Sequence, residues 1–335
     1  MSAAETAADT AADTAADTAA DTAAGDAGTS SWQNTIEGEW YGRPSVFAPD
    51  GTHQGTIKVS RASERRGDQT VYWMDTAFEV GSLLRGRLEG DAWNFMLDDD
   101  EKARVYLGPD IYGAGHPYGL LVDAHYYAPG WEADLRTMNH VLADGTTQVY
   151  SSLLYDGPTV AAVFNGIYTV AFDHDTNAAT QARVAEWCEA EAGRGTRPHV
   201  LPGKQSGRWT GTLEAWSAEQ EPVGKVEVEL THRPLDLLRT EQVLSLSGVL
   251  DDTLRFVRSR HGHRHTWDGP DLYGNAIGYG RAVYLSNHLH GVARKRTGRE
   301  FLIDDGHTMS VVWQWFEGDV RTLMTFGVLE WEPDA

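Results

Sequence analysis

The chain has 335 residues, of which 41% are hydrophobic, 23% charged and 10% aromatic. This composition excludes a collagen-like protein, a coiled coil and a wholly disordered chain. The formal net charge is −21, from 28 Lys and Arg against 49 Asp and Glu. We therefore expect neither nucleic acid nor an anionic membrane as a partner, because both need a basic patch. The single cysteine, Cys188, excludes an intramolecular disulfide and a thiolate metal cluster.

Residues 1–31 form an acidic tail that repeats Ala-Ala-Asp-Thr and contains no aromatic or large aliphatic residue. With nothing to bury, the tail is predicted to be disordered, and a short acidic helix is the alternative because alanine favours helix. The tail lacks the basic and apolar regions of a secretory signal, and no later stretch approaches the roughly 18 apolar residues of a membrane span. We therefore expect a cytoplasmic protein.

The chain contains an internal duplication. Residues 108–119 (GPDIYGAGHPYG) match residues 269–280 (GPDLYGNAIGYG), and turn signals further along recur in the same register. Upstream, Gly-Glu-Trp-Tyr-Gly at 38–42 resembles Gly-Arg-Trp-Thr-Gly at 207–211, at a slightly different spacing. Two homologous halves follow, so we divide the chain into the tail (1–31), a first domain with its linker (32–202) and a second domain (203–335).

Each half has the pattern of an all-β domain. Apolar and β-branched runs flank the turn signals Asp156-Gly157 and Glu317-Gly318, as in a hairpin. Eight to ten short antiparallel strands per half indicate a sandwich or a closed barrel, and we expect two tandem antiparallel β-barrels. After the first barrel, Val184, Trp187 and Cys188 lie at helical spacing, which predicts one amphipathic helix before the linker.

The Gly-x-Trp that opens each half, at Gly38–Trp40 and Gly207–Trp209, followed by a many-stranded meander, resembles the lipocalin or calycin superfamily. The Thr-Asp-Tyr turn motif of lipocalins is absent from the sequence. Two barrels in tandem are similar to the intracellular double-lipocalin proteins of secondary metabolism, which include cyclases of polyene or polyketide chains and carotenoid hydratases. The resemblance implies a cofactor-independent cyclase or isomerase, or a hydratase or lyase, of a polyketide or terpenoid pathway. It identifies no catalytic residue.

A closed barrel can enclose one small ligand, so residues that could face a lumen are candidates for a site. Tyrosine and histidine side chains can move a proton or polarise a carbonyl, and aspartate and aromatic groups can hold a ligand. A solvated outer face, turn chemistry or core packing would explain the same residues. The candidate catalytic residues are Tyr112, His125, Tyr273 and His288. The candidate ligand-binding residues are Asp123, Tyr127, Trp313 and Trp315.

Three histidines, His261, His263 and His265, alternate along one segment. On a strand, this spacing would direct three imidazoles to one face, where a metal ion could bind. Neighbouring arginines oppose a divalent ion, so a basic, solvent-facing loop or edge is the preferred interpretation. No nucleotide, nucleophile-elbow or zincin motif is present, so we expect no cofactor and no metal.

Two classes of function agree best with these sequence features. The first is a cofactor-independent enzyme that folds a hydrophobic small molecule into a reactive shape inside a barrel. The second is a non-enzymatic carrier or sensor of the same ligands. Polar side chains that converge deep in one pocket would favour the enzyme, and a uniformly apolar cavity would favour the carrier. A histidine-dependent metalloenzyme is the further alternative.

Overall fold

The computed structural model describes residues 31–66, 69–78, 95–99, 102–108, 111–128, 133–170, 205–303 and 307–334, with 178–179, 181–182, 185–186 and 189. The first half begins with helix α2 (Ser31–Ile36). Its strands are β1 (Gly38–Gly42), β2 (Ser45–Phe47), β3 (His53–Arg66), β4 (Gln69–Phe78), β5 (Phe95–Asp99), β6 (Arg104–Leu107), β7 (Tyr112–Tyr118), β8 (Leu121–Ala128), β9 (Ala133–Val141), β10 (Thr147–Asp156) and β11 (Thr159–Val170). The second half contains β12 (Gly207–Ser217), β13 (Pro222–Pro234), β14 (Arg239–Gly248), β15 (Asp252–His261), β16 (Arg264–Asp268), β17 (Leu272–Tyr279), β18 (Ala282–Leu289), β19 (Arg294–Leu302), β20 (Thr308–Glu317) and β21 (Val320–Pro333).

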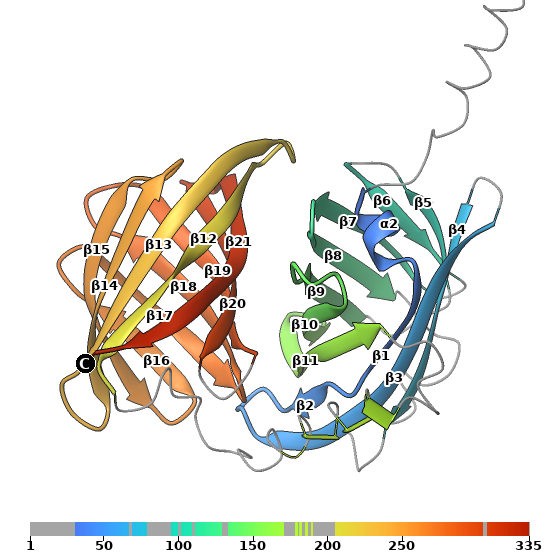
Figure 1. Cartoon of the computed structure of the whole chain (residues 1–335), viewed down its shortest axis with the longest axis horizontal. Coiled ribbons are helices and arrows are strands. Elements are labelled where there is room, and N and C mark those ends of the chain that lie inside the picture. The colour runs from blue at the N-terminus through green and yellow to red at the C-terminus, as the bar shows by residue number, and fades with distance from the viewer. Residues whose placement is uncertain are drawn as a thin grey trace, which may run out of the picture.

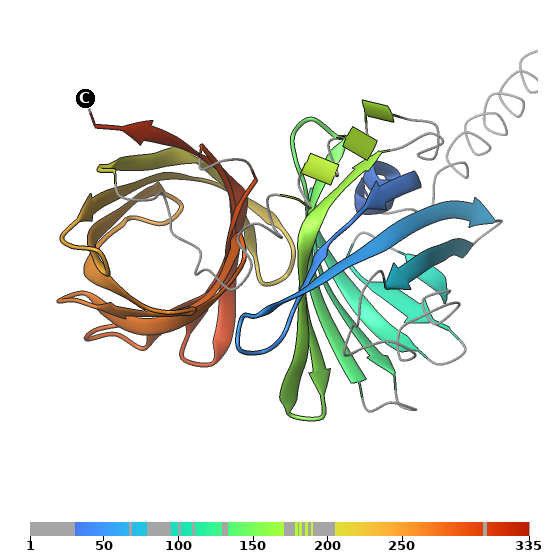
Figure 2. The same ribbon diagram turned by 90° about the horizontal axis from the view of Figure 1, so that it is seen from below.

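Each half closes into an antiparallel barrel, which confirms the expected fold class (Figure 1). In the second barrel each strand pairs with the next, and β12 pairs with β21 to complete the ring seen end-on in Figure 2. In the first barrel β1 and β2 together fill one strand position, since both pair with β3 and with β11. Pro44 separates β1 from β2, because proline cannot donate a ladder hydrogen bond.

Strand registers confirm the internal duplication. Ser152 pairs with Phe164 in the first barrel, and the residues at the same positions of the second barrel, Trp313 and Thr325, pair in the same way. The same holds on other strands of the two rings: Tyr106 pairs with Gly113, and their counterparts Trp267 and Gly274 pair with each other. The described strand residues of β6 to β11 therefore have defined counterparts in β16 to β21.

The two lumens are filled differently. The second barrel has a core that includes the buried indoles of Trp209, Trp313, Trp315 and Trp331. At the positions of Trp313, Trp315 and Trp331 the first barrel has only Ser152, Leu154 and Val170. Because barrels of this width need bulky side chains to fill them, the smaller set leaves space in the first lumen.

Helix α2 occupies one end of the first barrel (Figure 1). Trp32 and Ile36 are buried in the core of that barrel, and the carbonyl of Ile36 accepts a hydrogen bond of 3.0 Å from the indole of Trp40. Sequence patterns did not predict this helix, because six residues are too few to show a helical period. The two buried side chains of the helix help to close this end of the lumen.

The barrels pack on each other through equivalent faces. Tyr118, which ends the first copy of the repeated motif, packs against Met324 and Phe326 of the second barrel. Its counterpart Tyr279 packs against Phe47 and Val163 of the first barrel. Val163 and Met324 occupy the same position in the two barrels, so the contact resembles that of a symmetric dimer joined into one chain.

The repeated motif thus has a structural role in both halves. Gly119 and Gly280, directly after the two tyrosines, have φ of +59°, a left-handed conformation that glycine adopts without strain. These glycines turn the chain from β7 into β8 and from β17 into β18, and the turns place Tyr118 and Tyr279 at the contact between the barrels.

Other expectations concern segments that the structure describes only in part. Residues 178, 179, 181, 182, 185, 186 and 189 have helical backbone, but the predicted apolar face of Val184, Trp187 and Cys188 lies outside the described residues. The acidic tail before Ser31 and the domain boundary near Gly203 also lie outside them. Within the described part of the chain, no helix is long and apolar enough to cross a membrane.

The contact between the barrels makes the stability of the protein depend on pH. His140 is buried there, its Nδ1 is 2.9 Å from Ser310 Oγ, and burial together with the charge of Arg299 lowers its pKa from 6.5 to about 3. Below pH 6.5 the imidazole of His140 is protonated in the unfolded chain but stays neutral in the folded chain. Its contribution to the free energy of unfolding therefore falls by about 1.4 kcal/mol per pH unit as pH drops toward 3.

His140→Phe should reduce the slope between pH 4.5 and 6.5 by up to about 1.4 kcal/mol per pH unit, leaving the contribution of His232, whose pKa is also about 3. Phenylalanine does not titrate and is the residue at the same place in the second barrel, Phe301. The free energy of unfolding, measured by urea denaturation across that range, provides the test. His116→Gln, a change at an exposed histidine, is the control and should keep the wild-type slope. An unchanged slope in His140→Phe would contradict the assignment.

Candidate functional site

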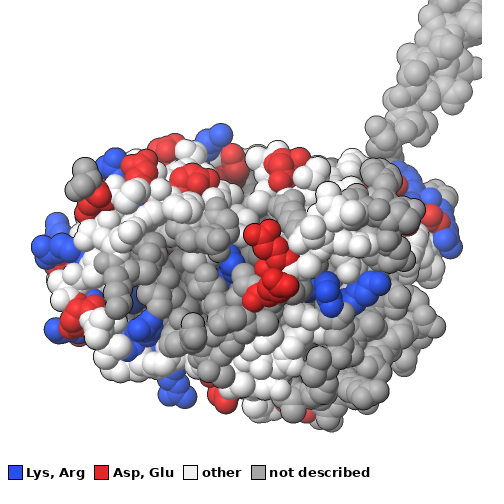
Figure 3. Space-filling view, turned by 60° about the horizontal axis from the view of Figure 1, so that its bottom comes forward, with Lys and Arg blue, Asp and Glu red and all other residues white. Residues whose placement is uncertain are grey.

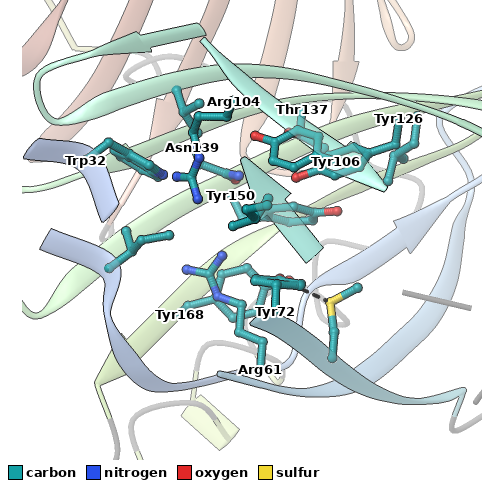
Figure 4. Close-up of a pocket in the computed structure, with 15 residues that line it drawn as sticks. Trp32, Arg61, Tyr72, Arg104, Tyr106, Tyr126, Thr137, Asn139, Tyr150 and Tyr168 are labelled. Carbon is teal, nitrogen blue, oxygen red and sulfur yellow. Dashed lines mark hydrogen bonds between the residues drawn. The ribbon is translucent and has the colours of Figure 1, made fainter. Parts of the chain in front are cut away.

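A cavity of about 40 Å³ lies in the lumen of the first barrel (Figure 4). Its wall combines two arginines, five tyrosines, two further polar side chains and residues of α2. These are Arg61, Arg104, Tyr72, Tyr106, Tyr126, Tyr150, Tyr168, Thr137, Asn139, Trp32 and Ile36. On a scale in which one water needs about 10–15 Å³, the space holds a few waters or one small polar group. We take this cavity as the candidate functional site.

Arg61 is the first charged group of the cavity. It continues the inward row of β3 after Ile57 and Val59, and only 6% of its surface is exposed. Its Nη2 donates a hydrogen bond to Oε1 of Gln148, and its guanidinium lies 4.8 Å from the ring centre of Tyr168. A neutral amide and an aromatic face are therefore the neighbours of this buried cation.

Arg104 is the second charged group and is positioned by α2. It begins β6 with 2% of its surface exposed, and its Nη2 donates to Oε1 of Gln33 at 2.7 Å. Gln33 donates in turn to Oγ of Ser63 at 3.0 Å, so the helix is tied to two strands. Figure 4 shows the guanidinium groups of Arg61 and Arg104 pointing toward each other at one side of the cavity.

The tyrosines form the rest of the polar lining. Tyr106 and Tyr126 stack with ring centres 4.7 Å apart, and Tyr150 meets Tyr168 edge to face at 5.1 Å. Burial raises the pKa of Tyr126, Tyr150 and Tyr168 well above 10. Their hydroxyls stay protonated at physiological pH and can therefore donate hydrogen bonds.

Several buried polar atoms around the cavity have no hydrogen-bond partner among the described residues. They are Nε of Arg61, Oγ1 of Thr137, Oδ1 of Asn139 and Nε2 of Gln148. Leaving such a group unsatisfied costs about 1–3 kcal/mol, so native proteins provide water or a ligand for it. The described residues that line the cavity include no aspartate or glutamate. The site therefore offers hydrogen-bond donors and positive charge to whatever enters.

The lumen of the second barrel contains a different polar group. Arg258 lies 3.7 Å from the carboxylate of Glu300 and donates from Nε to Nδ1 of His265 at 3.0 Å. Burial, followed by the charge of Arg258, lowers the pKa of His232 to about 3. In this barrel the buried Arg258 has a carboxylate of the protein beside it. The position of Glu300 is held by Asn139 in the first barrel.

A groove of about 600 Å³ separates the outer faces of the two barrels. Two charged residues of its wall are already paired. Asp123 accepts a hydrogen bond of 3.0 Å from Arg321, and Arg136 donates to Asp134 at 3.2 Å. The groove is larger than the lumenal cavity, but its charges are neutralised by neighbours. On the face shown in Figure 3, acidic and basic side chains are interspersed, without a continuous basic patch among the described residues.

The candidate catalytic residues lie on outer faces and do not line the lumenal cavity. Tyr112 contacts Tyr127 across β7 and β8 at 5.3 Å, and His125 lies 2.6 Å from Asp134. In the second barrel Tyr273 stacks on His288 at 5.2 Å. The alternation along β8 explains the outcome, because Val122, Ala124 and Tyr126 take the inward positions.

Candidate ligand-binding residues are divided between three places. Asp123 lines the groove between the barrels and Tyr127 lies on the outer face of β8. Trp313 and Trp315 are buried inside the second barrel, where Trp315 donates to Oγ1 of Thr325 at 3.1 Å. Both indoles pack in the core of this barrel, where Arg296 lies 4.6 Å from the ring centre of Trp313 and 5.8 Å from that of Trp315.

The three alternating histidines do not share one strand face, which corrects the geometry assumed for a metal site. His261 ends β15, His263 lies in the turn and His265 belongs to β16, where its side chain is buried. Gly262, with φ of +66°, reverses the chain between them. Over the described residues, no group of three or more His, Cys, Asp or Glu is placed to hold a metal ion. His261 and Arg264 are exposed, as the preferred interpretation of a basic, solvent-facing loop or edge expects, whereas His265 is buried.

Arg61 was not among the candidate residues, although the sequence contains a signal for it. Ile57, Val59 and Arg61 alternate along one strand, so an inward arginine follows from period-two spacing alone. Arg104 and the tyrosines carry no comparable local signal. Their convergence depends on closure of the ring, which brings β3, β6, β8, β9, β10 and β11 around one space.

Comparisons with known proteins support the fold alone. No family model matches the chain, and no curated protein matches it. A crystal structure of a protein of unknown function from the DUF3598 family of Nostoc punctiforme PCC 73102 is similar over 92% of this chain and 100% of that one, with a TM-score of 0.56 and 13% identity. A putative outer membrane protein from Bacteroides fragilis NCTC 9343 aligns over 91% of this chain and 100% of that one, at 7% identity and a TM-score of 0.21, which is too low to carry an argument.

The unequal pairing of the buried arginines makes a prediction about stability. Arg61→Met should change the free energy of unfolding by less than about 1 kcal/mol, or raise it, because an uncompensated buried charge is removed. Arg258→Met should lower it by about 3–5 kcal/mol, since the buried Glu300 loses the cation 3.7 Å away and keeps the attraction of Arg296. Denaturation of both variants beside the wild type measures the difference. Equal losses would show that Arg61 serves the fold and not a site.

Proposed function

We propose that the first barrel binds a small, largely apolar molecule in its lumen, and that the protein carries or senses this ligand. The observation that carries the proposal is the lumenal cavity, where aromatic and aliphatic walls surround buried polar atoms that have no partner among the residues the structure describes. Apolar walls with a few placed polar groups are the usual composition of a small-molecule site. In the described part of the second barrel, tryptophans fill the corresponding positions.

A ligand larger than the present cavity requires α2 to move. Trp32 and Ile36 belong to the cavity wall, and the helix that carries them has only six residues. Such a short helix has little stability of its own and depends on its packing in the lumen. Displacement of the two side chains would enlarge the cavity toward the end of the barrel that α2 covers. The ligand then replaces the apolar contacts that the helix gives up.

A cofactor-independent cyclase or isomerase is the second candidate. The resemblance to double-lipocalin cyclases and hydratases of secondary metabolism suggested it, and the protonated hydroxyls of Tyr126, Tyr150 and Tyr168 favour it. A phenol held neutral in an apolar site can donate a hydrogen bond to a carbonyl and stabilise charge that develops on it. Such a reaction would rearrange the bonds of a bound chain without a redox partner.

Filling the cavity tests the binding proposal. Val122→Phe places a ring in the lumen and should abolish binding of the apolar dye phenylnaphthylamine, with little loss of stability because space is available. Val283→Phe is the matched control at the same position of the second barrel. It should keep wild-type binding but lose about 1–3 kcal/mol of stability, because that core is full. Dye binding that survives Val122→Phe unchanged would contradict a lumenal site.

A chemical test separates the carrier from the enzyme. The small molecule that copurifies with the protein is extracted, identified by mass spectrometry and incubated with fresh protein. A carrier returns the molecule unchanged, whereas a cyclase or isomerase converts it into a product of equal mass and different retention. If conversion occurs, Tyr150→Phe should slow it, because that substitution removes one lumenal donor while preserving the ring. Tyr112→Phe, on the outer face, is the control.

A further inference from the structure

We infer that the ligand of the first barrel carries an acidic group, such as a carboxylate or sulfonate, and that this group binds between Arg61 and Arg104. The inference rests on the proposed lumenal site and names the chemistry of its occupant. The ligand is then an amphipathic acid, with an anionic head at the arginine side of the cavity and an apolar body among the aromatic residues.

The charge of the cavity favours an anion. Arg61 is buried, and in the described part of the chain its partners are the amide of Gln148 and the rings of Trp40 and Tyr168. A charge in such surroundings is costly unless an opposite charge accompanies it. Arg104 points toward Arg61 across the same space (Figure 4). Two facing cations repel each other, and an anion placed between them adds two attractions at shorter distance that outweigh the repulsion.

The two barrels differ in where the negative charge comes from. In the second barrel Arg258 meets Glu300 across the lumen, so the chain itself supplies the negative charge. In the first barrel the counterpart of Glu300 is Asn139, which lines the cavity and has the shape of a carboxylate side chain without its charge. The arginine of that pair is also replaced, since the counterpart of Arg258 is Leu97. The first barrel therefore has its own buried arginines, Arg61 and Arg104, but at the position of Glu300 it has a neutral side chain that lines the cavity.

Among the described residues, the buried polar atoms around the cavity without a partner include two that can only donate, Nε of Arg61 and Nε2 of Gln148. Oγ1 of Thr137 can donate or accept, and Oδ1 of Asn139 can only accept. The buried tyrosine hydroxyls are also protonated donors. An acceptor with two or three oxygens matches this set, and charge-assisted bonds from arginine to such a group are stronger than neutral ones. A neutral apolar ligand would leave the donors unsatisfied.

Two dyes that differ only in charge give the test. Anilinonaphthalene sulfonate carries an anionic group, and phenylnaphthylamine has the same body without it. The wild-type protein should bind the sulfonate about tenfold or more tightly than the neutral dye, a preference of about 1.4 kcal/mol or more. Fluorescence titration of the full chain measures both dissociation constants.

Asn139→Asp is the decisive variant, because it adds a negative charge to the cavity with almost no change of shape. We expect it to remove the preference for the sulfonate and to leave the neutral dye bound as before. Asn287→Asp is the matched control: Asn287 is equally buried but lies in the second barrel, where it accepts a hydrogen bond of 2.8 Å from Arg296. It should keep the wild-type preference. Arg61→Met provides a second route to the same loss of preference should Asn139→Asp fail to fold.

The possible outcomes distinguish the acidic ligand from the lumenal binding site on which it rests. Equal affinity for both dyes in the wild type, with binding that Val122→Phe abolishes, would overturn the acidic ligand and leave a lumenal site for neutral molecules. A preference for the sulfonate that persists in both Asn139→Asp and Arg61→Met would also overturn the inference, since the anion would then bind elsewhere. Binding that Val122→Phe leaves intact would remove the lumenal site itself.

Discussion

Closure of each sheet into a ring is the constraint on which the rest of the structure depends. A strand in a closed antiparallel sheet has one row of side chains in the lumen and one outside, and no free edge remains for another chain. Every side chain is thereby assigned to the lumen, the outer surface or the contact between barrels. Along β8, Val122 and Tyr126 face the cavity, whereas Asp123 faces the groove. The position of a residue along its strand therefore decides whether its side chain can reach a ligand in the lumen, whatever its chemical type.

The two barrels share topology and register but differ in what their lumens contain. Tryptophans and the Arg258–Glu300 pair fill the second lumen. In the first, smaller side chains leave space, and Asn139 takes the place of the acid. Packing of the second kind favours stability, whereas the buried Arg61, which has no carboxylate partner among the described residues, and donors without acceptors there reduce it. Groups that weaken a fold and converge on one space are typical of binding sites, whose geometry is maintained by the rest of the protein.

The sequence predicted the architecture well because its strongest signals are local or repeated. Turn dipeptides such as Asp156-Gly157 define hairpins by themselves, and the duplicated motif of residues 108–119 fixes the number of barrels. The site was not predicted, because it depends on which residues meet across a closed ring. Arg61 and Arg104 belong to β3 and β6 and share no local pattern. The conspicuous His265 was misjudged because one glycine, Gly262, turns a supposed strand into a hairpin.

Strand β9 forms part of the cavity wall of the first barrel and also contacts the second barrel. Thr137 and Asn139 point into the cavity, while the alternate residues Met138 and His140 contact the second barrel or the groove before it. At His140 the cavity wall is therefore backed directly by the outer face of the second barrel, whereas beside Thr137 and Met138 the groove lies between the two barrels. A single barrel with an under-filled lumen could relieve its unsatisfied groups by shifting this strand inward. The contact of His140 with Ser310 and Phe326 opposes that shift and keeps the cavity open.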